Sequence, residues 1–90
     1  MNLGQNYPNP FNPTTTIRFT LPGVEHVTLA VVDAQGNVVT TLVNATLVAG
    51  PQEVQWNGRD ARGNPVSSGV YFYRLQAGKR VETRKMVLIK

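Results

Sequence analysis

The fold is decided by residues 15–33, TTIRFTLPGVEHVTLAVVD, where two alternations of apolar and polar residues stand on either side of a Pro-Gly break. Apolar side chains occupy every second position of 17–21 and again of 27–31. A repeat of two is the side-chain period of a β-strand. The sequence therefore predicts strands at 15–21 and 25–33, and the extra apolar residues Ala30 and Val32 favour a central place for the second.

The rest of the chain continues this pattern with no sustained helical repeat. The turn formers at 33–37 predict a hairpin into a strand at 38–43, so that three consecutive strands would be antiparallel. Further strands are predicted at 53–57, 70–77 and 80–90, with Gly78 and Lys79 forming a type II′ turn between the last two. The last of these, apolar on both faces near its end, is interpreted as a buried closing strand.

These strands predict an all-β fold, an immunoglobulin-like antiparallel β-sandwich of six to seven strands, with a Greek key favoured over a meander. Residues 1–90 are long enough for one domain, in which 1–14 form a Pro- and Asn-rich lead-in and 15–90 the sandwich. The lead-in is predicted to be irregular, with Tyr7 and Phe11 folding back over the core. Met1 is interpreted as a start residue added to a C-terminal domain excised from a larger secreted protein.

Composition and charge weigh against several classes of function. The chain has no Cys, which excludes thiolate metal sites and cysteine nucleophiles. Its only histidine, His26, is not accompanied by a nucleophile motif of the kind that serine hydrolases need. The net charge is +4, but the basic residues form no single block: four arginines are dispersed, and the five basic residues near the C-terminus are interrupted by Glu82. No apolar run is long enough for a membrane helix. We therefore expect no enzyme activity, no catalytic residues, no cofactor, no nucleic-acid partner and no membrane-spanning segment.

Two features leave alternatives open. Asp60, together with carbonyl groups of the turn that follows it, could offer oxygen ligands to an ion, or its carboxylate could cap its own turn. The aromatic residues around Trp56 and Tyr71–Tyr73 could form a sugar-stacking platform, but the core interpretation is stronger, because these rings alternate with aliphatic partners. Val70 and Phe72 face away from the tyrosines and are predicted to form an exposed contact patch.

An ordered set of motifs resembles a known family. The segments NYPNPFNPTT (6–15), SGVYFYRL (68–75) and KMVLIK (85–90) resemble the type A C-terminal sorting domains of the bacterial type IX secretion system, and the resemblance covers essentially the whole chain. The same patterns occur in the related immunoglobulin-like domain of the flagellar hook-capping protein. The chain departs from the pattern at Asn57, where an Asp is usual.

The resemblance implies a sorting signal that directs a secreted parent protein to the outer-membrane translocon for export and cell-surface attachment. It implies passage through the periplasm, a sortase-like peptidase as a second partner, and attachment of the parent to an anionic lipopolysaccharide. By the same resemblance, translocon recognition falls on Gly69, Tyr71, Lys85 and Lys90. We expect a monomer. The alternative function is a carbohydrate-binding or structural module appended to a secreted glycoside hydrolase or adhesin.

Overall fold

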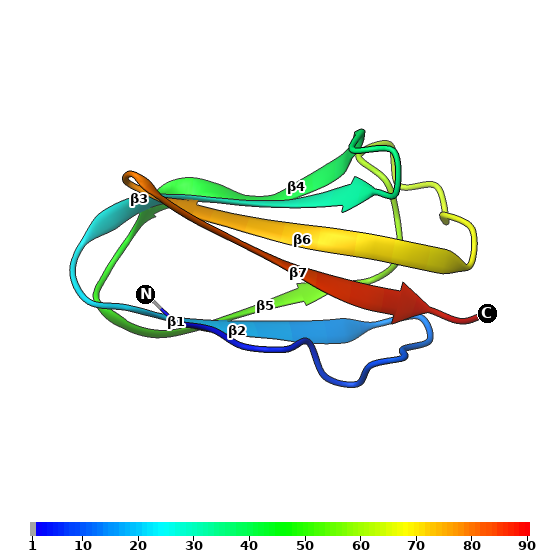
Figure 1. The fold of residues 1–90 in the computed structure, drawn as a ribbon, viewed down its shortest axis with the longest axis horizontal. Coiled ribbons are helices and arrows are strands. Elements are labelled where there is room, and N and C mark those ends of the chain that lie inside the picture. Colours follow the sequence, from blue (N-terminus) through cyan, green and yellow to red (C-terminus); the bar gives the residue numbers. More distant parts are fainter. Residues whose placement is uncertain (1) are drawn as a thin grey trace.

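Two antiparallel sheets face each other in the computed structural model, which describes residues 2–90 (Figure 1). The first sheet has the strand order β1-β2-β5 and the second β4-β3-β6-β7. The strands are β1 (Asn2–Leu3), β2 (Thr15–Leu21), β3 (Glu25–Asp33), β4 (Val38–Leu47), β5 (Gly50–Trp56), β6 (Gly69–Ala77) and β7 (Arg80–Leu88). The predicted immunoglobulin-like β-sandwich of six to seven strands is confirmed, and the strand that the sequence pattern did not indicate is β1, in the lead-in. Met1, interpreted above as an added start residue, lies outside the described residues.

The order of the strands is a Greek key. β3 and β4 form a hairpin, the chain then crosses to β5 in the first sheet, and β6 returns to the second sheet to pair with the free side of β3. Followed around the sandwich, β6 returns beside β3, the first of the three consecutive strands β3, β4 and β5, although β4 and β5 lie in different sheets and are not paired. The expectation of three successive antiparallel strands was wrong for β2, which pairs with β1 and β5. The Pro22-Gly23 break carries the chain across the sandwich, so that the apolar faces of β2 and β3 meet.

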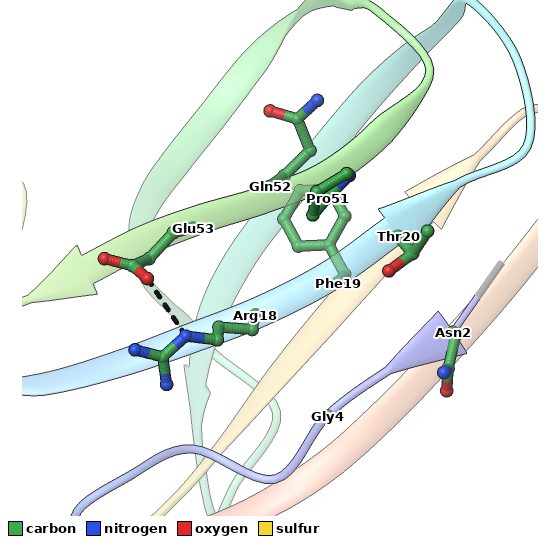
Figure 2. Close-up of a pocket in the computed structure, with 8 residues that line it drawn as sticks. All are labelled: Asn2, Gly4, Arg18, Phe19, Thr20, Pro51, Gln52 and Glu53. Atoms are coloured by element: carbon green, nitrogen blue, oxygen red, sulfur yellow. Dashed lines mark hydrogen bonds and ion pairs between the residues drawn. The ribbon is translucent and has the colours of Figure 1, made fainter.

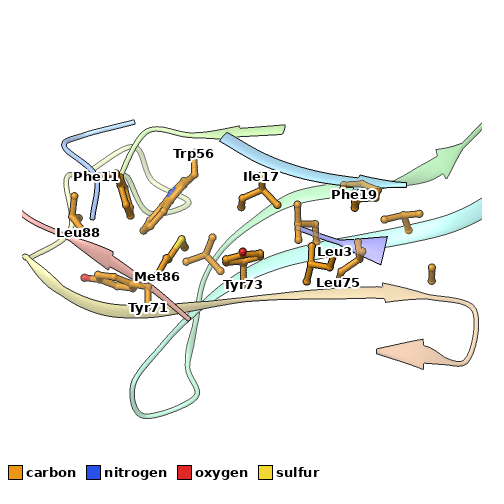
Figure 3. Packing of buried hydrophobic residues seen from close by; sticks show 14 of the residues in the cluster. Leu3, Phe11, Ile17, Phe19, Trp56, Tyr71, Tyr73, Leu75, Met86 and Leu88 are labelled. Carbon is orange, nitrogen blue, oxygen red and sulfur yellow. The ribbon is translucent and has the colours of Figure 1, made fainter. Parts of the chain in front are cut away.

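The inner faces follow the predicted alternation and fill the space between the sheets (Figure 3). Trp56 packs at one end of this core, with its ring centroid 5.6 Å from that of Phe11 and 5.4 Å from that of Tyr71. The predicted central position of β3 is confirmed, because even its outward-facing Ala30 and Val32 are buried between β4 and β6. The core cluster consists of Leu3, Phe11, Ile17, Phe19, Leu21, Val27, Leu29, Val31, Trp56, Tyr71, Tyr73, Leu75, Ala77, Met86 and Leu88.

The boundaries differ from prediction in β4, β5 and β7. β4 continues to Leu47 and β5 begins at Gly50, so both are longer than the sequence pattern indicated. β7 is not a buried closing strand over most of its length: its first six residues are exposed, and only Met86 and Leu88 are fully buried. The reason is its place at the edge of the second sheet, where β6 is its only neighbouring strand.

The lead-in is more ordered than its prolines suggested. Asn2 and Leu3 form a short strand, and Phe11 is buried as predicted, but Tyr7 is 74% exposed. Tyr7 and Thr16 exchange two backbone hydrogen bonds of 2.9 Å, which makes them a cross-strand pair. Thr16 faces away from the core because its neighbour Ile17 faces into it, so the opposite side chain, Tyr7, points outward as well.

Candidate recognition surface on the last two strands

β6 and β7 form a regular hairpin that carries most of the predicted recognition residues. Nine residue pairs run without a register shift from Gly69 opposite Leu88 to Ala77 opposite Arg80. In the two-residue loop Gly78 has a φ of 61° and Lys79 does not have a positive φ. This is the φ pattern of a type II′ turn, as predicted. This regular register fixes which side chains share a face.

The outer face of this hairpin brings Lys85 next to the predicted contact patch. Val70 lies opposite Val87, and Phe72 lies opposite Lys85. Direct cross-strand partners project to the same side of a sheet. Val70 is 41% exposed, Phe72 and Val87 are half-buried, and Lys85 is exposed. We call these four residues the outer patch: an apolar strip with a cationic side chain at its border.

Tyr71 lies on the opposite face, in the core. Its ring meets Trp56 edge-on, at an interplanar angle of 68°, and its hydroxyl donates a 2.7 Å hydrogen bond to the carbonyl of Ser67. Burial raises the pKa of Tyr71 above its ordinary value of 10.0, and the nearby Asp33 carboxylate raises it further. The structure therefore separates Tyr71 from the outer patch and gives it a role in holding the loop that leads into β6.

The burial of the other rings also bears on whether the aromatic residues form a sugar-stacking platform. Trp56 is 1% exposed and Tyr73 is fully buried, so neither ring offers a face to a sugar. Phe72 is half-buried on the outer face. The core interpretation is therefore confirmed for Trp56, Tyr71 and Tyr73.

Tyr73 anchors the lead-in, a role that sequence reasoning missed. Its hydroxyl donates to the carbonyl of Gly4 at 2.7 Å and accepts from the backbone N–H of Asn6 at 2.9 Å. Burial raises the pKa of Tyr73, while the Asn6 hydrogen bond and the Arg84 charge oppose that rise. A tyrosine that faces the core predicts that its hydroxyl has hydrogen-bond partners, since a buried hydroxyl needs them. The alternation of side chains along the strand does not show which residues those partners are.

Asn9 and Phe11 of the lead-in run beside the end of β7. Phe11 donates its backbone N–H to the Val87 carbonyl and accepts from the N–H of Ile89, both at 3.0 Å. The side chain of Asn9 accepts from the N–H of Val87, also at 3.0 Å. We call these three hydrogen bonds the clasp. Sequence reasoning missed the clasp, because a proline-rich segment gives no period from which a partner could be inferred.

The last two predicted recognition residues lie at the ends of the hairpin strands. Gly69 begins β6 opposite Leu88, and Lys90 follows β7, where its N–H donates to the Ser68 hydroxyl at 3.0 Å. Both residues are thus ordered close to the clasp. Lys85 and Lys90 lie towards the same end of β7, while Tyr71 supports that end from within.

Two turns of the same sequence pattern lie beside this end of the sandwich. In each, one carboxylate oxygen of an Asp accepts the N–H groups two and four residues later, at 2.9 to 3.0 Å. Of the two interpretations of Asp60, the structure thus shows the cap on its own turn. No group of three or more potential metal-ligating side chains converges among residues 2–90. The pattern repeats in the sequence, as DAQGN at 33–37 and DARGN at 60–64, and this repeat is a signal that predicts the same cap in both turns.

A hollow of about 450 Å³ lies on the first sheet, among residues of β1, β2 and β5 and the adjoining Gly4 (Figure 2). Two of its lining side chains, Arg18 and Glu53, form an ion pair of 2.9 Å across β2 and β5. None of the predicted recognition residues lines it. No helix long and apolar enough to cross a membrane occurs among residues 2–90.

Comparison with known proteins places this architecture in a family. PorZ of Porphyromonas gingivalis, described as an essential bacterial surface component of the type IX secretion system, is 27% identical with a TM-score of 0.69. The match covers 96% of this chain and 11% of PorZ. Dimeric latent PorU from the same organism, at 19% identity and a TM-score of 0.78, shares the fold over 97% of this chain and 9% of its own.

FlgD from P. aeruginosa is 27% identical, with a TM-score of 0.65 over 82% of this chain and 57% of FlgD. This chain thus spans about a tenth of PorZ and of PorU and just over half of FlgD. No curated protein matched the sequence. Residues 9–81 match the family of the FlgD Ig-like domain, which covers most of the sandwich. The chain therefore belongs to the FlgD Ig-like domain family, and it is similar to a domain of a type IX secretion component.

Proposed function

We propose that this domain is a C-terminal sorting signal that brings a secreted parent protein to the type IX translocon in the outer membrane. The observation that carries the proposal is the ordered end of β7, which is joined to the lead-in by the clasp and lies next to the exposed outer patch. The resemblance of the ordered motifs to type IX sorting domains and the similarity to PorZ support a role in the type IX secretion system.

The chemistry of the outer patch suits a protein partner. A half-buried apolar strip bordered by a charged side chain resembles the core and rim of a protein–protein interface. Phe72 and Val70 supply the apolar area, and Lys85 supplies charge for orientation. Recognition of this kind needs no chemistry from the domain, so we propose a non-enzymatic role.

The rest of the route is part of the same proposal. The domain is a monomer that passes through the periplasm and reaches the cell surface with its parent. A sortase-like peptidase acts on it there, and the parent is joined to an anionic lipopolysaccharide. These partners act on the parent protein as well as on the domain, so the domain's own contribution is the recognition surface.

The test is export of a reporter. Residues 2–90 are fused to the C-terminus of a periplasmic reporter in a host that has a type IX system, and surface exposure is measured by protease accessibility on intact cells. We expect the wild-type fusion to reach the surface. A fusion that stays in the periplasm, while an established sorting domain exports the same reporter, contradicts the proposal.

A charge-reversal pair locates the surface. Lys85→Glu changes the charge beside Phe72, whereas Arg62→Glu makes the same change on an exposed turn outside the outer patch. We expect export to fall at least about tenfold for Lys85→Glu and to stay near the wild-type level for Arg62→Glu. Equal export of the two variants would exclude Lys85 from recognition.

A further inference from the structure

The four edges of the two sheets differ in how well they can accept another strand. The first sheet ends on β1, which has only two residues, and on β5, where Pro51 lacks a backbone donor. The second sheet ends on β4, whose pairing with β3 has two register shifts, and on β7. Short strands, prolines and bulges are the usual protections against strand pairing. β7 has none of them: its nine residues are regular and contain neither proline nor glycine.

The direction of the backbone groups of β7 follows from the clasp. Val87 and Ile89 bond to the lead-in, and the carbonyl of Lys85 accepts from the side chain of Gln5, so these residues turn their polar groups away from β6. Backbone direction alternates along a regular strand. Val81 and Thr83 therefore turn their N–H and C=O groups to the same outer edge.

The lead-in occupies this edge only at its far end. Within residues 2–90 the backbone groups of Val81 and Thr83 have no hydrogen-bond partner on that side, and Val81 is 52% exposed. The N–H of Lys85 adds one more outward-facing donor to those of Val81 and Thr83. The result is an open stretch at 81–85 that ends where the Gln5 contact begins, and we call it the open edge.

The charge around the open edge selects its partner. Lys79 and Lys85 are exposed here, against a single acid, Glu82. Arg84 adds a third positive charge, although its Nε donates a 2.8 Å hydrogen bond to the Leu3 carbonyl. Arg80 is already paired with Glu25 at 2.9 Å. Together with the net charge of +4, this positive surface opposes pairing with a second copy of the chain and favours an acidic strand.

We propose that the open edge binds an extended peptide segment with acidic side chains, which adds a strand to the second sheet beside β7. Main-chain hydrogen bonds from Val81 and Thr83 hold the segment, and the basic side chains select its sequence. The inference deepens the proposed function and rests on it for its biological setting.

The probe is a synthetic eight-residue peptide in which Glu alternates with Val, added to the purified chain. Binding is followed by amide hydrogen exchange in NMR spectra. We expect the amides of Val81 and Thr83 to exchange at least about tenfold more slowly with the peptide, and a peptide with Lys in place of Glu to have no effect. Unchanged exchange at millimolar peptide, or equal protection by both peptides, overturns the proposal.

Thr83→Pro and Thr83→Val form a matched pair. Proline removes the outward N–H but no hydrogen bond to β6, because edge strands tolerate proline where the donor would face away from the sheet. Valine keeps the donor. We expect Thr83→Pro to bind at least about tenfold more weakly than Thr83→Val while the fluorescence of Trp56 reports the same fold. Equal affinity of the two folded variants contradicts strand addition.

Two further outcomes separate this inference from the proposed function. A chain that dimerises, with concentration-dependent protection of Val81 and Thr83, would show that the occupant is a second copy and refute the acidic partner. Because the binding assay uses the purified chain, export of the reporter without peptide binding refutes only this inference. Peptide binding without export refutes only the proposed function.

Discussion

Replacing Tyr73 by Phe removes one oxygen atom from the centre of the molecule and tests how the lead-in is held. The ring is fully buried, and its hydroxyl joins the carbonyl of Gly4 to the N–H of Asn6. Asn6 is 2% exposed, so water cannot replace the lost acceptor. An unsatisfied buried donor costs about 1–3 kcal/mol, and the lost bond to Gly4 adds about 1 kcal/mol. We expect Tyr73→Phe to lower the free energy of unfolding by about 2–4 kcal/mol.

This loss is large for a domain of this size. At about 0.05–0.15 kcal/mol per residue, a ninety-residue domain has about 5–13 kcal/mol in total. Each kcal/mol moves the melting temperature of such a domain by about 4–8 °C, so Tm should fall by at least about 8 °C. Urea denaturation followed by the fluorescence of Trp56, the single tryptophan, measures the change.

Tyr7→Phe is the matched control, because Tyr7 is 74% exposed and its hydroxyl has no partner among residues 2–90. It should change stability by less than about 0.5 kcal/mol. Hydrogen exchange adds a local readout, since Tyr73→Phe should speed exchange of the Asn6 amide beyond the global effect. A Tyr73→Phe variant as stable as Tyr7→Phe, with the Asn6 amide still protected, would refute the anchoring role.

Three further predictions follow from the same structure. Phe11→Ala leaves a cavity beside Trp56 and should cost about 3–5 kcal/mol, with a red shift of the fluorescence that an unchanged emission maximum would contradict. The contribution of Tyr71 and Tyr73 to stability should be constant below the unfolded tyrosine pKa of about 10 and be lost as the pH rises above it, because burial raises both folded pKa values and favours the neutral forms; a urea midpoint that does not fall between about pH 9 and 11.5 would refute this. Gly58→Ala should cost about 1–3 kcal/mol, because Gly58 has a φ of 73° and a Cβ there would lie 3.1 Å from a lead-in carbonyl; equal urea midpoints would show that the backbone adapts.

The strands could be predicted from the sequence where apolar side chains that face the core alternate with polar side chains that face solvent. β2, β3 and β6 were placed well because their alternation reports directly on the core face. The alternation does not report which strands pair, so the crossing between β2 and β3 was missed. It also does not show where a sheet ends, so β7 was interpreted as buried although it has one neighbour only.

The candidate site was predictable only in part, for a related reason. The separation of Phe72 from Tyr71 follows from alternation, and the outer patch confirms it. The contribution of Lys85 to that patch depends on the register between β6 and β7, which the tight turn at Gly78 fixes. The anchor on Tyr73 and the clasp depend on contacts between residues more than sixty positions apart, and no local pattern encodes them.

Phe11 and the end of β7 are joined across almost the full length of the chain. During translation, residue 11 leaves the ribosome long before residues 87–89, so the clasp forms only after residues 87–89 have been synthesised. Until then Phe11 lacks both of its backbone partners at the end of β7. The lead-in therefore completes its attachment to the sandwich only after the chain has been synthesised at least as far as Ile89.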